Sequence, residues 1–318
     1  MNPEQIALTL ERVRTAVATR VVGQDAVLEE ALAAFLARGH VLLEGVPGVA
    51  KTLMVRTLAA ALGARFGRIQ FTPDLMPSDV TGVSVLHDAT SRFEFHPGPI
   101  FTDLLLADEI NRAPAKTQAA LLEAMQERQA TVDGTPHALG PLFTVFATQN
   151  PVEYEGTYPL PEAQLDRFLV KLRVPYPSLD AELQMLALHE GGAGEPDDGA
   201  SGVEPVVDTE TLHALRDAAD GVRVAPEVRR YVADIVRATR EDSAFTLGGS
   251  PRASVALLRI ARAAAVIAGR DFATPDDVKG FAPAVLRHRV ILAPELEVEG
   301  RTPDEALAEL LDRVPAPR

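Results

Sequence analysis

Short runs of consecutive apolar residues alternate with helical patterns over the first 190 residues of the chain. Four such runs cover residues 40–44, 101–109, 142–149 and 169–172. An unbroken apolar run is typical of a strand that is buried on both faces of a parallel sheet. The pattern therefore predicts an α/β fold in which helices cover both faces of a parallel sheet.

The second half of the chain has a different pattern, with apolar residues at helical spacing. We expect helices over residues 228–240, 251–268, 275–286 and 303–311. A stretch rich in glycine and acidic residues, without periodicity, separates the two halves and is typical of a linker. The predicted organisation is an α/β core over residues 1–190, a linker over 191–204 and a helical lid domain over 205–318.

Two hairpins are expected as insertions in the core. Residues 83–86 and 92–95 are strand-like and flank a polar turn at 88–91. Residues 130–132 and 135–137 flank Asp133–Gly134, a favoured two-residue hairpin turn. Both insertions are candidates for contact with a substrate, although surface decoration without a role would have the same pattern.

Composition narrows the function classes. The 318 residues are 47% hydrophobic and 24% charged, contain no cysteine, and carry a formal net charge of −14. Such a charge disfavours nucleic acid as the main partner, since phosphate backbones are bound by Lys and Arg. The basic clusters Arg259 with Arg262 and 287–289 are interpreted as solvated helix surfaces. No membrane insertion is expected, and the absence of cysteine fits a reducing, cytoplasmic location.

The segment after the first apolar run has the composition of a phosphate-binding loop. Lys51 would reach the β- and γ-phosphates, Thr52 would offer a hydroxyl to Mg²⁺, and glycines would let backbone N–H groups surround phosphate oxygens. Ala50 stands where the common G-x-x-x-x-G-K-[ST] pattern has its second glycine. Because this position opens the helix, we expect ordinary helical φ and ψ angles there. The loop consists of Gly45, Val46, Pro47, Gly48, Val49, Ala50, Lys51 and Thr52.

Two carboxylates end the next apolar run. Asp108 and Glu109 fall where the carboxyl end of a parallel strand is expected, which is the edge of the sheet that binds ligands. There Asp108 would hold Mg²⁺ through water, and Glu109 would orient and deprotonate the attacking water. Asn150 follows the third run and could polarise the same water, although Asn before Pro151 is also a common turn residue.

Two arginines stand near predicted element boundaries. Arg167 precedes the fourth run, where it could pair with Asp166, remain solvated, or act as an arginine finger on a neighbouring subunit. Ser250 is suited to cap a helix that begins at Pro251, which puts Arg252 in the first turn. A cation opposes the helix dipole there, so either a nearby anion or exposure to solvent would relieve the conflict.

The order of these motifs resembles that of AAA+ ATPases, specifically the MoxR family. The resemblance covers nearly the whole chain and includes residues 69–79, which are similar to the most distinctive sequence of that family. It implies a Mg²⁺-dependent ATPase that forms a homo-oligomer, as a hexameric ring, and remodels or activates a protein partner. A protein with a von Willebrand factor A domain is the partner that the resemblance suggests.

The resemblance also implies roles for single residues. Lys51 and Thr52 match the phosphate loop, and Asp108 and Glu109 match the Mg²⁺ and catalytic pair. Further roles are the sensor-one residue for Asn150, the arginine finger for Arg167, the second sensor for Arg252, and adenine contact for Val22, Gly23 and Gln24.

Four other functions stay open on the sequence alone. A nucleotide-gated scaffold would bind ATP with little turnover, but it could dispense with Glu109. A Mg-chelatase-like subunit would depend on a tetrapyrrole-handling partner, and a DNA motor is disfavoured by the acidic balance. A P-loop kinase would leave Asn150 and Arg252 without a clear task.

Overall fold

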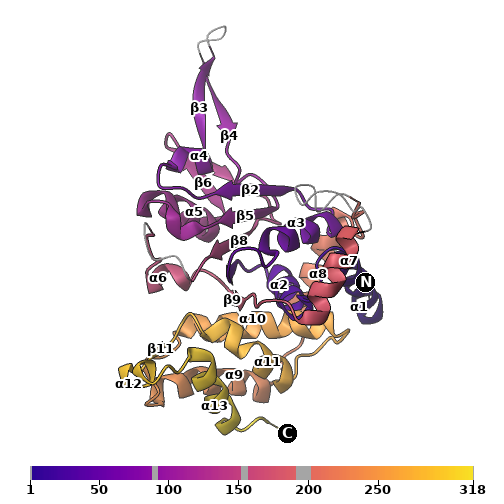
Figure 1. Ribbon diagram of the computed structural model, residues 1–318, viewed down its shortest axis with the longest axis vertical. Coiled ribbons are helices and arrows are strands. Elements are labelled where there is room, and N and C mark those ends of the chain that lie inside the picture. The colour runs from indigo at the N-terminus through magenta and orange to yellow at the C-terminus, as the bar shows by residue number, and fades with distance from the viewer. Residues whose placement is uncertain (1, 88–91, 152–156, 191–201, 318) are drawn as a thin grey trace.

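The computed structural model describes residues 2–87, 92–151, 157–190 and 202–317 (Figure 1). Five parallel strands form the central sheet in the order β2-β5-β8-β1-β9. Their bounds are β1 Val41–Glu44, β2 Phe66–Gln70, β5 Leu104–Asp108, β8 Thr144–Gln149 and β9 Val170–Arg173. The predicted α/β fold is confirmed, and each of the four apolar runs contains a strand of this sheet.

The central strands are buried on both faces because their alternate side chains enter different apolar clusters. Leu105 and Val145 pack into one cluster with helix α5. Leu43 and Leu106 pack into the other cluster, together with helices α1, α2 and α3 and most of the lid helices. The core helices are α1 Pro3–Ala18, α2 Asp25–Leu36, α3 Lys51–Ala61, α4 Pro77–Thr81, α5 Ala115–Glu127, α6 Glu162–Leu165 and α7 Leu179–Glu190, with a 3-10 turn at Ile110–Arg112.

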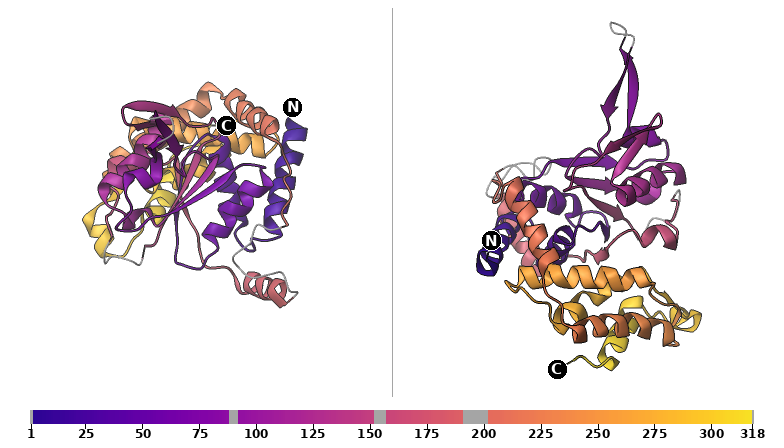
Figure 2. Two further views of the ribbon diagram at one scale, coloured as in Figure 1. Left: turned by 90° about the horizontal axis from the view of Figure 1, so that it is seen from above. Right: turned by 180° about the vertical axis from the view of Figure 1, so that it is seen from behind.

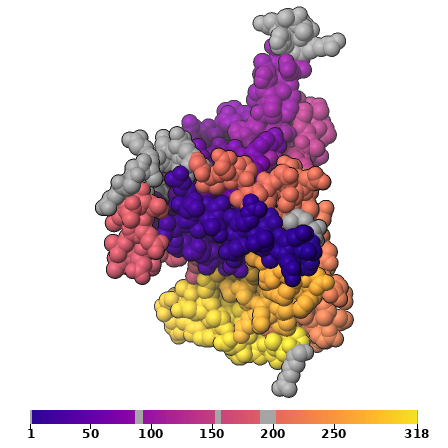
Figure 3. Space-filling model, turned by 90° about the vertical axis from the view of Figure 1, so that its right-hand side faces the viewer, coloured from indigo at the N-terminus to yellow at the C-terminus, as the bar shows by residue number. Residues whose placement is uncertain are grey.

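The second half of the chain is helical, with α8 beside α2 and the other helices in a layer below the sheet (Figures 1 and 2). Its elements are α8 Thr209–Gly221, α9 Pro226–Glu241, α10 Pro251–Ile267, α11 Pro275–Leu286, α12 Pro294–Val298 and α13 Pro303–Arg313, with a short antiparallel pair of β10 Phe245–Leu247 and β11 Ile291–Leu292. Ser250, Thr274 and Thr302 cap α10, α11 and α13 as their positions before a proline predict. Figure 3 shows the N-terminal helices seated directly against this layer, in agreement with the apolar cluster that they share.

Both predicted hairpins are present. Strands β3 Gly82–His87 and β4 Arg92–Pro97 pair between β2 and β5 in the chain and extend away from the body (Figure 2). The turn predicted at 88–91 lies outside the described residues, as does most of the predicted linker. Strands β6 Gln129–Val132 and β7 Thr135–Ala138 pair around Asp133–Gly134, and both turn residues have the positive φ of a primed turn. No helix within the described ranges is both long and apolar enough to cross a bilayer.

His40, just before β1, joins three elements of the core. The Val145 N–H donates to its Nδ1 at 3.0 Å, so the ring proton is on Nε2, which lies 3.2 Å from the Met125 carbonyl oxygen. A second proton on Nδ1 would face that N–H. Burial, reinforced by the positive charge of Arg128, lowers the pKa of His40 to about 3.

This arrangement makes stability sensitive to acid. Because the folded-state pKa of His40 lies below its unfolded value near 6.5, the unfolded chain takes up a proton first as the pH falls. Above pH 6.5, neutral His40 makes its full contribution to the free energy of unfolding. This contribution should decline by up to ~1.4 kcal/mol for each pH unit between 6.5 and 3. Buried His288, whose pKa burial also lowers, should add to the slope.

Urea denaturation between pH 7.5 and 5 would measure the free energy of unfolding of the wild type, His40→Gln and, as a control, His96→Gln on the exposed face of β4. We expect a smaller pH slope for His40→Gln and an unchanged slope for His96→Gln. A wild-type slope in the His40 variant would contradict the assignment.

Candidate functional site

A cavity of about 340 Å³ lies at the carboxyl edge of the sheet. It collects residues from the loops after three strands, β1, β5 and β8, as the strand polarity requires. The lining residues are Pro47, Gly48, Ala50, Lys51, Thr52, Asp108, Glu109, Thr148, Gln149 and Asn150. The structure therefore brings the predicted phosphate loop, both carboxylates and Asn150 together in one place.

The phosphate loop differs from expectation at one residue. Ala50 has φ 60° and ψ 23°, in the left-handed region, and α3 begins only at Lys51. The expectation of ordinary helical angles at Ala50 is wrong, because the chain turns once more before the helix starts. Gly48 is also left-handed, with φ 86°. Within the described part of the chain, the N–H groups of Gly48, Val49 and Ala50 have no backbone acceptor. Such unpaired N–H groups suit the oxygens of a phosphate chain.

Lys51 lies over this loop. Its ammonium donates to the carbonyl oxygens of Gly45 and Val46, each at 2.7 Å. Partial burial lowers the pKa of Lys51, while the negative charges of Asp108 and Glu109 act in the opposite direction. The Gly45 position cannot take a side chain, since a Cβ there would stand 2.7 Å from the Val174 carbonyl oxygen.

Asp108 is held by two neighbouring strands. Its Oδ1 accepts from the Thr148 hydroxyl on β8 at 2.6 Å, and its Oδ2 accepts from Arg68 on β2 at 2.7 Å. Thr148 also accepts from the Glu109 N–H at 2.8 Å. One hydroxyl therefore fixes both the Asp108 carboxylate and the backbone that carries Glu109.

Glu109 has a strained backbone and a fixed side chain. Its φ of 55° and ψ of 49° are left-handed. The carboxylate accepts at Oε2 from Gln70 at 2.8 Å and from Arg112 at 3.0 Å. Oε1 has no hydrogen bond that the described residues account for, so it keeps its lone pairs for another donor.

The segment predicted to contact adenine, residues 22–24, lies beside this cavity and not in its lining. Gln24 donates to the Pro175 carbonyl oxygen at 3.0 Å, next to Val174, which packs on Gly45. A Cβ at Gly23 would stand 2.6 Å from Ala181 of α7. The buried Gln24 Oε1 has no partner among the described residues.

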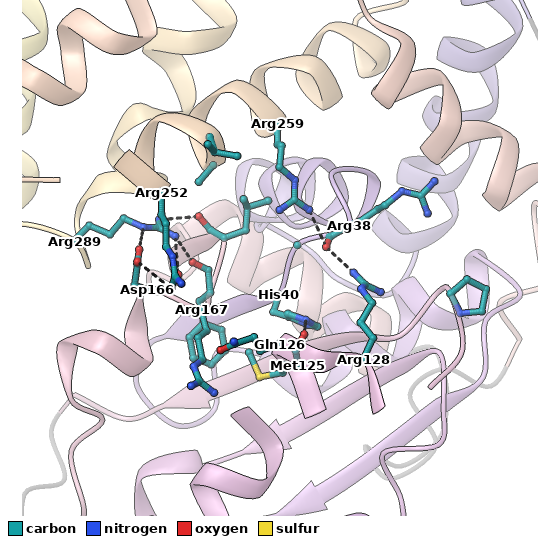
Figure 4. Close-up of a pocket in the computed structure, with 16 residues that line it drawn as sticks. Arg38, His40, Met125, Gln126, Arg128, Asp166, Arg167, Arg252, Arg259 and Arg289 are labelled. Atoms are coloured by element: carbon teal, nitrogen blue, oxygen red, sulfur yellow. Dashed lines mark hydrogen bonds and ion pairs between the residues drawn. The ribbon is translucent and has the colours of Figure 1, made fainter. Parts of the chain in front are cut away.

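Arg167 and Arg252 are elsewhere. Both line a second cavity, of about 650 Å³, together with residues that precede β1, β8 and β9, such as Gly39, Pro141 and Leu169 (Figure 4). This is the amino edge of the sheet, separated from the first cavity by the length of β1, roughly 13 Å for four residues. The structure does not bring the two arginines to Lys51 of the same chain.

Comparison with known proteins agrees with this geometry. A family model described as "ATPase family associated with various cellular activities (AAA)" matches residues 40–170, and an AAA lid domain model matches residues 237–310. "Chaperone MoxR1" of Mycobacterium tuberculosis is 42% identical over 98% of this chain and 83% of its own length. "Protein MoxR" of Methylorubrum extorquens is 32% identical over 95% and 93%. The chain belongs to the MoxR family of AAA+ ATPases.

Two further relatives cover the chain almost completely. "Uncharacterized protein YeaC" of Bacillus subtilis is 50% identical over 93% of this chain and 91% of its own length. A crystal structure of a Cytophaga hutchinsonii protein superimposes with a TM-score of 0.90 and 38% identity, covering 99% of this chain and 97% of that chain. This MoxR-family chain therefore has both the fold and the domain content of its relatives.

The donor set of the MoxR-family site fits Mg²⁺ bound together with a nucleotide. Among the described residues no group of three or more His, Cys, Asp or Glu side chains could hold a metal on its own. Mg²⁺ usually takes one or two protein ligands and completes its shell with water and phosphate oxygens. Thr52 and Asp108, which line the same cavity, could supply those two contacts.

Four residues of this site were not found from the sequence: Arg68, Gln70, Arg112 and Thr148. A usable signal existed for Thr148, because it is a polar residue at the end of an otherwise apolar run. Arg68 and Gln70 are two residues apart on β2, so their side chains lie on the same face of the sheet. Because β2 pairs with β5, Gln70 lies beside Asp108.

The left-handed backbone at Ala50 leads to a direct test. Because a Cβ disfavours this region by about 1–2 kcal/mol, Ala50→Gly should raise the free energy of unfolding by up to ~1 kcal/mol with nucleotide affinity retained. Ala50→Val should destabilise the fold and weaken binding, since a branched side chain is still less suited to positive φ. Denaturant unfolding and nucleotide titration would measure both. Equal stability of all three proteins would contradict the strained conformation.

Proposed function

We propose that this protein hydrolyses ATP with Mg²⁺ in a homo-oligomeric ring and uses the reaction to remodel or activate a protein partner. The observation that supports this most is the separation of the two cavities. One edge of the sheet has the phosphate loop and the carboxylates, and the opposite edge has Arg167 and Arg252. A ring of like-oriented subunits, hexameric in this proposal, would place the second edge of one subunit against the first edge of the next.

The residues of the first cavity divide the work of phosphoryl transfer. The loop N–H groups and Lys51 would hold the phosphates, and Thr52 and Asp108 would hold Mg²⁺, which would supply positive charge to the phosphate oxygens. Glu109 accepts the proton of the attacking water at Oε1, while Gln70 and Arg112 hold Oε2 in place. Asn150 orients the same water, and residues 22–24 lie against the base.

The second cavity provides two arginines for the γ-phosphate of a neighbouring site. Arg167 has no carboxylate partner among the described residues, and the Arg252 side chain is 71% exposed. Since neither arginine lies near Lys51 of its own chain, we assign both to the site of the neighbouring subunit, Arg167 as the finger and Arg252 as the second sensor.

The two hairpins are the proposed contacts to a protein partner, for which a von Willebrand factor A domain protein is the candidate from the family resemblance. The β3–β4 hairpin extends from the body and has exposed apolar residues, including Phe93, which is 74% exposed. A cytoplasmic location stays a prediction from the sequence.

Two substitutions should separate binding from chemistry. Lys51→Ala should abolish tight ATP binding, because it removes the charge that bridges the phosphates. Glu109→Gln should bind ATP almost normally and lose hydrolysis by a factor of ~10²–10⁴, the usual contribution of a positioned base. Isothermal titration and phosphate release would measure the two effects. Near-normal hydrolysis by the Glu109 variant would remove its assigned role.

Mixed assemblies should test the trans arrangement. Arg167→Ala subunits should bind ATP and hydrolyse it poorly, since a finger in trans contributes a factor of about 10³–10⁵. Mixing them with Lys51→Ala subunits creates interfaces where an intact Lys51 site faces an intact Arg167. Some ATPase activity should therefore return.

Co-assembled rings that stay as inactive as either parent would mean that Arg167 is not the finger or that one defective interface silences the ring. Titration of each variant with wild-type subunits distinguishes these two cases, because a silenced ring loses activity steeply with the first defective subunits.

A further inference from the structure

The tripeptide Arg287-His288-Arg289 follows α11 in the lid, and its side chains point into the core instead of into solvent. The interpretation of this cluster as a solvated surface is wrong. Arg287 donates to the Lys171 carbonyl oxygen at 3.0 Å, and His288 Nε2 lies 3.1 Å from the Phe168 carbonyl oxygen. Of the two arginines, Arg289 is the more deeply buried, with only 4% of its side chain exposed.

All five N–H donors of the Arg289 guanidinium are occupied. Nε donates to Asp166 Oδ1 at 2.7 Å, and one terminal nitrogen bonds the carbonyl oxygens of Asp166 and Phe168 at 3.3 and 2.6 Å. The other terminal nitrogen bonds the Leu169 carbonyl oxygen at 3.0 Å and that of Val285. Four of these five acceptors belong to residues 166–169, so one lid side chain holds the backbone on both sides of Arg167.

Asp166 also brings the second lid arginine to this place. Its Oδ2 lies 3.9 Å from the Arg252 guanidinium, while its Oδ1 is bound to Arg289 (Figure 4). The flanking residue Phe168 is fully buried in the core, which prevents the segment from sliding. All four residues of this segment line the second cavity, and Arg167 is the one cation among them.

We infer that Arg289 is a positioning residue for the arginine finger, which makes the lid and the finger of one subunit a single body that acts on the neighbouring site. This inference rests on the proposed trans role of Arg167. A rotation of the lid would then carry Arg252 and Arg167 together, because Arg289 ties the segment that contains Arg167 to the lid.

The test uses the full-length chain with Arg289→Lys and, as a second variant, Asp166→Asn. Lysine keeps the charge but cannot reach five acceptors, and asparagine keeps the shape of Asp166 but loses its charge. Both variants should bind ATP within about twofold of wild type, because the Lys51 cavity lies at the other edge of the sheet. The kcat should fall at least tenfold with little change in KM.

Co-assembly with other variant subunits then shows whether the finger or the nucleotide site is defective. An Arg289→Lys subunit has an intact Lys51 site and a misplaced finger, so co-assembly with Lys51→Ala should restore ATPase activity. Co-assembly with Arg167→Ala should restore none, since every finger in that ring is defective. Asp166→Asn should behave in the same way. A variant that only weakened its own nucleotide site would show the reverse pattern.

Arg270→Lys is the matched control. Arg270 also makes a two-pronged bond to a carboxylate, Asp277, but entirely within the lid. Its loss should lower the melting temperature and leave kcat near the wild-type value. An equal fall in kcat for Arg270→Lys would overturn the inference, because lid stability alone would then explain the effect.

The mixture of Lys51→Ala and Arg167→Ala subunits, assayed in parallel, distinguishes a failure of the Arg289 inference from a failure of the proposed function. If that pair recovers activity and Arg289→Lys is restored by Arg167→Ala or by neither partner, the positioning role is wrong and the proposed function stands. If the pair itself recovers nothing, and titration with wild-type subunits shows that one defective interface does not silence the ring, the trans finger fails and the role of Arg289 fails with it.

Discussion

In a sheet whose five strands all run in one direction, every carboxyl end lies at one edge and every amino end at the other. This polarity determines where each functional group stands. The loops after β1, β5 and β8 bring Lys51, Asp108 and Asn150 to one cavity, and the loops before β1, β8 and β9 form the other. No rearrangement of side chains can move Arg167 across the length of a strand. In the proposed function, the phosphate-binding groups and the arginines of one complete site are therefore supplied by two chains.

Arginines that bond backbone carbonyl oxygens attach the lid to the core, in addition to the apolar cluster that the two parts share. Arg216 of α8 donates to the Pro141 and Leu142 carbonyls, Arg259 of α10 donates to the Ala37 and Arg38 carbonyls, and Arg289 bonds residues 166–169. Burial, together with the positive charges of Arg38 and Arg128, lowers the pKa of Arg216 to about 9. A buried charge is tolerated only when hydrogen bonds replace its water. The fixed fork of the guanidinium therefore sets the lid orientation more strictly than apolar contact would.

Local spacing was enough to find the residues whose chemistry depends on a short motif, such as Lys51, Thr52, Asp108 and Glu109. Apolar runs also identified four of the five strands, and proline after a capping residue marked the starts of three lid helices. The sequence could not show that 287–289 is buried, because the acceptors are carbonyl oxygens, which every residue has. It also could not show that Thr148 joins Asp108 to Glu109, since that contact depends on which strands are neighbours. The conformation of Ala50 was missed for a related reason: a helix start predicted from pattern is uncertain by a residue or two, and that residue decided the φ angle.

Backbone strain is concentrated at the two cavities. Among the described residues, five that are not glycine have positive φ, and four of them line a cavity: Ala50 and Glu109 the first, Arg38 and Arg128 the second. Each costs on the order of 1 kcal/mol, which glycine would avoid. Glycine, however, would remove the carboxylate of Glu109, and it would remove the guanidinium with which Arg128 bonds the Arg38 carbonyl oxygen. At Glu109 and Arg128, a left-handed backbone is combined with a side chain that makes hydrogen bonds, whereas the methyl group of Ala50 makes none. In the proposed ring, the first cavity of one subunit would face the second cavity of its neighbour, so these strained positions would lie at one interface. The strain would then be located at the surface where hydrolysis depends on the precise placement of side chains.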